Sequence, residues 1–156
     1  MKAGVKWVVG GLAAAAICLQ FTNPARTNPP VTPGHDLLAT NPPPAEIVAL
    51  LHGACYDCHS DETKWPWYSH VAPVSWFLVD HVNEGRRHLN FSNWPHDDPA
   101  SARKKWNHVA DQVSSGDMPL SSYAWIHASA RLTAGQREQL VKWAEEEAKR
   151  LKSDAD

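Results

Sequence analysis

The pentapeptide Cys55-Tyr56-Asp57-Cys58-His59 restricts this chain more than any other segment of its sequence. Two thiols separated by two residues lie on one turn, at the spacing that forms thioethers with both vinyl groups of a porphyrin. A histidine directly after them can place an imidazole nitrogen beneath the iron. The pattern therefore predicts one covalently attached haem c, with Cys55 and Cys58 as attachment residues and His59 as the proximal iron ligand.

A Cys-x-x-Cys pair also occurs in zinc sites and in thioredoxin-type redox sites. Structural zinc takes four ligands, commonly from a second cysteine pair or a paired histidine motif. The chain has three cysteines, and the third, Cys18, lies in the apolar N-terminal run. Because the chain holds nine histidines, a zinc site formed by both cysteines, His59 and a distant histidine stays an alternative. A thioredoxin-type site requires a βαβ context, and the sequence before Cys55 has no convincing strand pattern.

The N-terminus carries the pattern of a segment that enters a membrane. Lys2 and Lys6 precede an apolar run, and positive charge on this side keeps the N-terminus in the cytoplasm. Residues 1–21 are therefore predicted to be a membrane anchor or a signal segment. We favour a retained anchor, because no small-x-small cleavage site follows and Ile17 before Cys18 is unsuited to lipoprotein processing. The domain is expected on the periplasmic side of the bacterial inner membrane, or free in the periplasm if the segment is cleaved.

A proline-rich segment, residues 22–44, separates this N-terminal segment from the predicted domain, residues 45–152. Its prolines resist helix formation, so we expect a semi-rigid spacer that lifts the domain off the bilayer, or a segment that wraps the domain surface. The 156 residues leave room for one compact domain plus these appendages. A net charge of −2 gives no basic footprint, so no nucleic-acid partner is expected.

The domain has the apolar periodicity of four helices and no sustained strand alternation, so the fold is predicted to be all-α. It is expected to be a small, cytochrome c-like helical domain around one haem, with an N-terminal membrane helix. Helix start and stop signals, such as Asp98-Pro99 and Gly116, mark the boundaries. The predicted helices span residues 45–58, 73–89, 98–116 and 133–152. Their expected inward faces are Ile47, Leu50, Leu51, Ala54, Cys55 and Cys58; Val74, Phe77, Leu78, His81, Val82, Gly85 and Leu89; Ala102, Trp106, Val109, Ala110 and Val113; and Leu140, Val141, Ala144, Ala148 and Leu151.

Met118 is the predicted iron ligand opposite His59. It is the only methionine besides the initiator, and it lies in Gly116-Asp117-Met118-Pro119, between two predicted helices. Glycine lets this loop turn and proline stiffens it, so that the sulfur can be held inward. A thioether is a soft, neutral ligand that favours ferrous iron and raises its potential. His127, in the same irregular region, is the second candidate, and an open distal position is the third.

The order of these parts resembles a small mono-haem c-type cytochrome, and more closely the bacterial haem-binding domain family, which carries one Cys-x-x-Cys-His motif in a tryptophan-rich frame. The resemblance covers about Pro30 to Trp143. It implies haem attachment and leaves the reaction open. The segments that carry it are Cys55–Ser60, Trp65–Ser69, Ala72–Trp76, His81–Arg86, Asn90–Trp94, Gly116–Pro119 and Tyr123.

Eight tryptophans are unusual for this length, and flat side chains suit either the wall of a flat cofactor or a tryptophan-rich core. Trp65, Trp67 and Arg86 are candidate donors to the haem propionates, because charge-assisted hydrogen bonds are strong. The alternative is core packing for the two tryptophans and a surface ion pair or helix-dipole contact for Arg86.

The sequence thus predicts a membrane-tethered, periplasmic cytochrome that transfers single electrons and is a carrier, not an enzyme. Its redox partner protein is not defined by the sequence. A haem-based sensor or small peroxidase with an open distal side is the main alternative, and a structural zinc module is a third.

Overall fold

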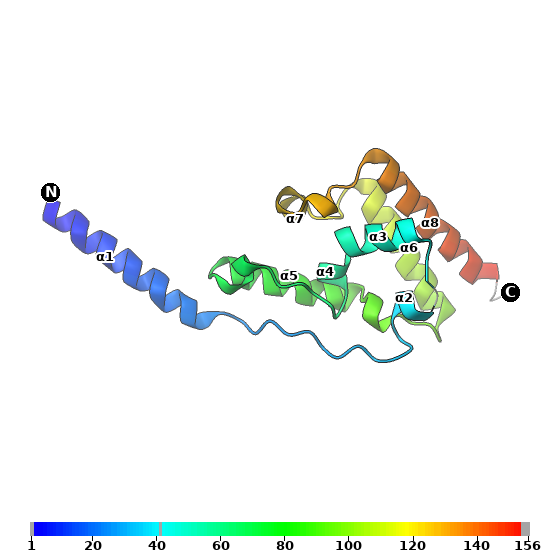
Figure 1. The fold of residues 1–156 in the computed structure, drawn as a ribbon, viewed down its shortest axis with the longest axis horizontal. Helices are drawn as coiled ribbons and strands as arrows, with labels where there is room; N and C mark the ends of the chain where they lie inside the picture. The colour runs from blue at the N-terminus through cyan, green and yellow to red at the C-terminus, as the bar shows by residue number, and fades with distance from the viewer. Residues whose placement is uncertain (1, 41, 154–156) are drawn as a thin grey trace.

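A computed structural model describes residues 2–40 and 42–153 of the chain. The regular secondary structure of the described part consists of helices without any strand, which confirms the all-α prediction (Figure 1). Met1 and Asn41, which belong to the predicted N-terminal and proline-rich segments, lie outside the described residues.

Helix α1 (Lys2–Leu19) and the 3₁₀ turn η1 (Gln20–Thr22) extend from one end of the domain (Figure 1). Residues 4–22 are exposed along their whole length. The span Gly4–Thr22, with 19 residues, is long and apolar enough to cross a membrane. A helix of this length rises about 28 Å, close to the thickness of a bilayer's hydrocarbon core.

The proline-rich segment runs extended along the domain instead of projecting away from it. Arg26 donates to the carbonyl of Ser69 at 3.1 Å, and Asn28 donates to the carbonyl of Thr63 at 2.9 Å. The segment ends in the short helix α2 (Leu37–Thr40), whose Leu37 is buried in the core. The segment therefore wraps the domain surface, as in the second of the two expectations, and does not form a projecting spacer.

The first predicted helix is divided at the cysteine motif into α3 (Ala45–Ala54) and α4 (Tyr56–His59). Cys55 breaks the helix with φ −125° and ψ −42°, while its N–H still donates to the carbonyl of Leu51 at 2.9 Å. The predicted inward residues of α3 are buried, including Ile47 and Leu51. The break makes α4 a separate single turn after α3.

Helix α5 (Val74–His88) lies between the 3₁₀ turns η2 (Trp67–His70) and η3 (Phe91–Asn93). The predicted inward face of this helix was partly correct, because Val82 and Leu89 are buried and Leu78 and Gly85 are half-buried. Ser75, Val79 and Val82 are buried, whereas Val74 and Phe77 are 45% and 66% exposed. The small, polar Ser75 is on the packed face because the proline-rich segment passes there, and its hydroxyl donates to Asn23.

Helices α6 (Pro99–Ser115) and α8 (Ala134–Ser153) form an antiparallel pair, joined by α7 (Ser121–Ile126) and η4 (Ala128–Ala130) (Figure 1). The helix stop and helix start signals predicted from the sequence are present in the structure. Gly116 ends α6 with φ 86°, in the left-handed region that favours glycine. Thr133 and Gln136 exchange hydrogen bonds of 2.9 and 3.2 Å in a capping box.

The core lies between α6, α8 and α3, and tryptophans fill much of it. The ring of Trp106 is 4.4 Å from that of Trp94 and 4.6 Å from that of Trp143. Phe91 is fully buried and stacks on Tyr56, directly beside the cysteine motif. The tryptophan-rich core is therefore the interpretation that the structure supports for these three residues.

The cap of α6 gives a direct test of the fold. Asp98 accepts from the N–H of Ser101 at 3.0 Å, so we expect Asp98→Ala to lower the free energy of unfolding by about 1 kcal/mol. Urea unfolding followed by circular dichroism measures the change. Asp97→Ala removes the same charge from the neighbouring exposed position and should leave stability within about 0.5 kcal/mol of the starting protein. Equal losses in both variants would contradict the cap.

Candidate functional site

A cavity of about 400 Å³ lies between the cysteine turn and α5 on one side and α6, α7 and the Met118 loop on the other. This volume is in the range of about 300–1,000 Å³ that ligand pockets occupy. Its wall is mostly apolar, with Ala54, Leu89 and Phe91 near the cysteine turn and Val109 and Val113 across from them. Cys55, Cys58, His59 and Met118, the four predicted attachment and ligand residues, all line it.

His59 is held by the carboxyl end of α5. Its Nδ1 lies 3.0 Å from the carbonyl oxygen of Gly85 and 3.1 Å from that of Leu89. A carbonyl oxygen only accepts, so Nδ1 carries the proton and Nε2 keeps its lone pair. Burial lowers the pKa of His59 below its usual 6.5, against the effect of the two carbonyls, so the ring is neutral at neutral pH. Neutral imidazole with a free Nε2 is the form that binds a metal ion, and the partner on Nδ1 fixes the ring's orientation.

The two cysteines are half-buried in the wall of the cavity and are thiols at neutral pH. Burial raises the pKa of Cys55 to about 12, with a smaller contribution from Cys58. Burial also raises the pKa of Cys58 to about 11, helped by the carboxylate of Asp57 and opposed by Arg86.

The described residues contain no group of three or more His, Cys, Asp or Glu side chains arranged to hold a metal ion. The zinc alternative therefore has no support in the part of the chain that the structure describes.

Gly85 permits the close approach of α5 to the cysteine turn. A Cβ atom at this position would lie 2.6 Å from the carbonyl oxygen of Cys58, a distance that side chains do not adopt. Only glycine therefore lets the carbonyl of residue 85 reach the ring of His59.

The Met118 loop is fixed to the helices on both sides of it. The N–H of Met118 donates to the carbonyl of Gln112 at 3.0 Å, and its own carbonyl accepts from Arg137 at 3.1 Å. The same guanidinium group of Arg137, on α8, also donates to the carbonyl of Val113. Met118 is half-buried and lines the cavity, so the loop holds this side chain in the wall of the site.

A second connection joins the cysteine turn to the far wall. The hydroxyl of Tyr123, on α7, donates to Oδ2 of Asp57 at 2.6 Å. The other oxygen of Asp57 accepts from the N–H of Lys64 at 3.0 Å. Asp57 thus links the motif, the loop after it and α7 across the cavity.

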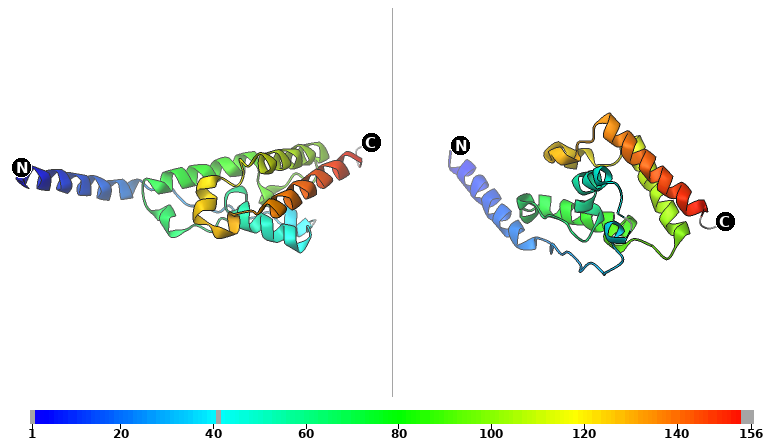
Figure 2. Two further views of the ribbon diagram at one scale, coloured as in Figure 1. Left: turned by 90° about the horizontal axis from the view of Figure 1, so that it is seen from above. Right: turned by 45° about the vertical axis from the view of Figure 1, so that its right-hand side comes forward.

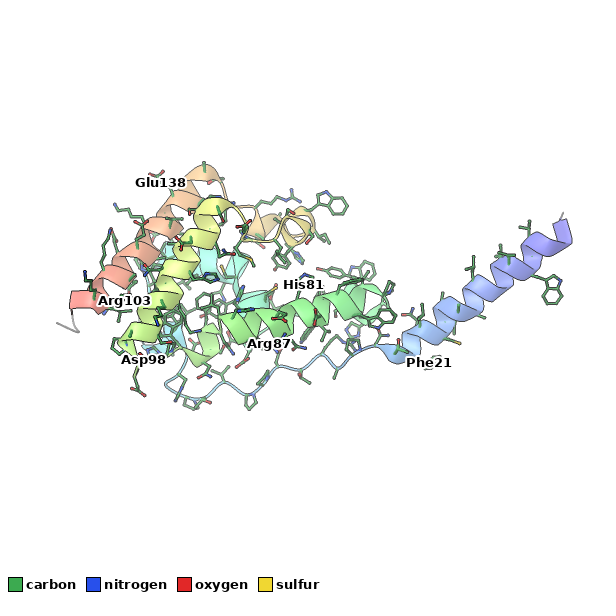
Figure 3. The ribbon with its side chains drawn as sticks, turned by 180° about the vertical axis from the view of Figure 1, so that it is seen from behind. Phe21, His81, Arg87, Asp98, Arg103 and Glu138 are labelled. Carbon is green, nitrogen blue, oxygen red and sulfur yellow. The ribbon has the colours of Figure 1, made fainter. Side chains whose placement is uncertain are left out.

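His127, the second candidate for the distal position, does not line the cavity. Its Nδ1 donates to the carbonyl of Tyr123 at 3.1 Å, and its Nε2 accepts from the hydroxyl of Tyr68 at 3.0 Å. Both ring nitrogens are therefore engaged within the protein. His81, His88 and His108 do line the cavity, as exposed side chains at its rim, and His81 is labelled on α5 in Figure 3.

The three candidate propionate donors lie outside the cavity lining. Trp65 donates through its indole nitrogen to Asn28 at 3.1 Å, and Trp67 is 78% exposed. Arg86 donates to the carbonyl of Ser60 at 2.8 Å and to the carbonyl of Thr27 at 2.8 Å. It also lies 3.6 Å from the carboxylate of Asp61. Arg86 therefore fastens the proline-rich segment to the loop after the cysteine motif. None of the eight tryptophans, all of which are described, lines the cavity.

The residues present fit a haem. An apolar cavity contains a neutral imidazole with a free Nε2, two thiols at the correct spacing, and a thioether held in its wall. These features, in an all-helical domain, assign the protein to the class of haem-binding proteins.

The comparisons agree with this class. The sequence model of the haem-binding domain family matches residues 14–146, and the chain belongs to this family. No curated protein and no solved structure matches the chain.

Sequence reasoning missed several residues that build the site. Apolar periodicity places Gly85 on an inward face but does not indicate its role, which depends on a contact with Cys58 across 27 positions of the chain. Asp57 and Tyr123 lie in segments that resemble the family, but their hydrogen bond to each other is not apparent from the sequence, and Arg137 has no local signal. Their partners are distant in sequence, which periodicity does not report.

The glycine contact is testable. We expect Gly85→Ala to push α5 away from the cysteine turn, to lower the free energy of unfolding by about 3 kcal/mol, and to reduce haem incorporation several-fold. Urea unfolding and the haem-to-protein absorbance ratio measure the two effects. Gly135→Ala is the matched control, because a Cβ there meets nothing within 4 Å and alanine favours α8. Unchanged incorporation in Gly85→Ala would contradict the proposed support of His59.

Proposed function

We propose that this protein is a membrane-tethered, periplasmic mono-haem c-type cytochrome that carries single electrons. Cys55 and Cys58 are the attachment residues, His59 is the proximal ligand and Met118 is the distal ligand. A haem held in this way supplies one iron that cycles between the ferric and ferrous states.

The observation that carries the proposal is the position of His59 and Met118 in the wall of one cavity, each held by backbone hydrogen bonds. The two carbonyls at the end of α5 keep Nε2 of His59 available. Arg137 and Gln112 hold the backbone of Met118 on the far side. Ligands that keep their positions in both oxidation states reduce the rearrangement that accompanies electron transfer, which suits a carrier.

Two further observations support the remaining parts of the proposal. Cys55 and Cys58 lie half-buried in a mostly apolar cavity wall, which suits the apolar edge of a porphyrin. The apolar span Gly4–Thr22, preceded by Lys2, supports a tether with the domain on the periplasmic side. The same features would be present for a cleaved signal segment, which N-terminal sequencing of the purified protein distinguishes.

The distal ligand separates an electron carrier from a sensor or peroxidase with an open iron. We expect the ferrous starting protein not to bind carbon monoxide and its ferric form to have the sulfur-to-iron absorption band. Met118→Ala should lose this band, bind carbon monoxide stoichiometrically, and have a lower reduction potential, because the soft thioether that favours ferrous iron is gone. Absorption spectroscopy and redox titration measure these changes.

His127→Ala is the control, since this histidine lies outside the cavity lining and is bound to Tyr68 and to the Tyr123 backbone. It should keep the spectrum of the starting protein. Loss of distal ligation in His127→Ala but not in Met118→Ala would reverse the assignment. Rapid carbon monoxide binding by the unmodified protein would instead favour the sensor or peroxidase.

A further inference from the structure

The exposed apolar side chains of the domain are gathered in two short segments. Beyond η1, the exposed large apolar side chains of the described residues fall in residues 67–77 and 125–126. Trp67 is 78% exposed, Phe77 66% and Trp125 80%. Scattered exposed apolar residues are normal, but a cluster of large ones marks a contact surface. We call Trp67, Val71, Val74, Trp76 and Phe77 the apolar patch.

The patch also lies in an uncharged part of the sequence. Residues 65–79 contain no Asp, Glu, Lys or Arg, and neither do residues 120–130. Charged groups resume directly outside it, at Lys64 and Asp80. A surface that is apolar, aromatic and uncharged costs little to remove from water.

The patch adjoins the end of the apolar N-terminal helix. Gln20 accepts from the N–H of Ala72 at 3.0 Å and donates to the carbonyl of the same residue at 3.3 Å. The indole N–H of Trp76 donates to the carbonyl of Thr22 at 3.2 Å. These bonds hold the 3₁₀ turn η1 against the loop that precedes α5. Phe21, between Gln20 and Thr22 in the sequence, is exposed.

The patch lies at the end of the domain from which α1 extends. The beginning of α5 and helix α7 lie at the end of the domain nearest α1, and α8 lies at the far end (Figure 1 and Figure 2). Residues 7–25 contain no charged side chain, so the uncharged stretch continues from the helix into this end of the domain.

We infer that the apolar patch rests in the headgroup region of the phospholipid bilayer, so that the domain lies on the membrane surface. Tryptophan is favoured at this level because its ring is apolar while its N–H is satisfied by a polar partner. The inference rests on the proposed tether through α1. A second copy of the chain is the other occupant of such a surface, and the continuity with α1 favours the lipid.

Photocrosslinking tests this inference. The full chain, with α1 present, is reconstituted into vesicles of phosphatidylethanolamine and phosphatidylglycerol that contain a phospholipid with a diazirine near its headgroup. After irradiation, mass spectrometry locates the modified peptides. We expect lipid adducts in α1 and in residues 65–79, and none in α8.

Two variants sharpen the result. Val74→Ser/Phe77→Ser should reduce adducts in residues 65–79 several-fold and leave those in α1 unchanged. Both side chains are exposed, so the fold should persist. Ala100→Ser/Ala134→Ser, at exposed positions of α6 and α8, is the control and should change neither.

Adducts confined to α1 would overturn the inference and leave the tether in place. Absence of adducts from α1 as well would overturn the tether too. Crosslinks from residues 65–79 to a second copy of the chain, or undiminished adducts in Val74→Ser/Phe77→Ser, would also overturn it.

Discussion

The hydrogen bonds between His59 and the carboxyl end of α5 are the interaction on which the site depends. Two carbonyl oxygens, of Gly85 and Leu89, select the tautomer that leaves Nε2 free. The carbonyl of Gly85 lies in the last turn of α5 and also accepts the N–H of Leu89 at 2.9 Å, while Leu89 is the cap residue that follows the helix. Carbonyl groups at this end of a helix carry partial negative charge. The end of α5 therefore both orients the ring of His59 and increases the basicity of its Nε2. This requires glycine at residue 85, because a side chain there would clash with Cys58.

The cavity exists because two parts of the domain approach each other without filling the space between them. One part is the cysteine turn with α5, which the wrapped proline-rich segment and Arg86 hold together. The other is the pair α6 and α8, which the tryptophan cluster packs tightly. Tyr123 and Asp57 join the two parts at the edge of the cavity. The tryptophans thus stabilise the frame and leave the wall of the site to smaller side chains.

Local signals predicted much of this arrangement, because they act within a few residues. The cap at Asp98, the glycine stop at Gly116 and the box at Thr133 each involve neighbours in sequence. The faces of α5 were not predictable in this way. One face packs against a proline-rich segment about 50 residues earlier, and another lines a cavity. Apolar periodicity alone therefore missed Ser75 and placed the exposed Val74 and Phe77 inward. The same reason hid Arg137, whose partners lie 19 and 24 residues away.

The central claim is that this cavity holds a haem bound covalently through Cys55 and Cys58. The intact mass of the denatured full chain, produced together with the cytochrome c maturation machinery, tests it most directly. The account predicts the mass of the chain plus one haem, and the bare chain mass for Cys55→Ser/Cys58→Ser. A bare chain mass for the unmodified protein, with haem absent or removed by denaturation alone, would contradict it.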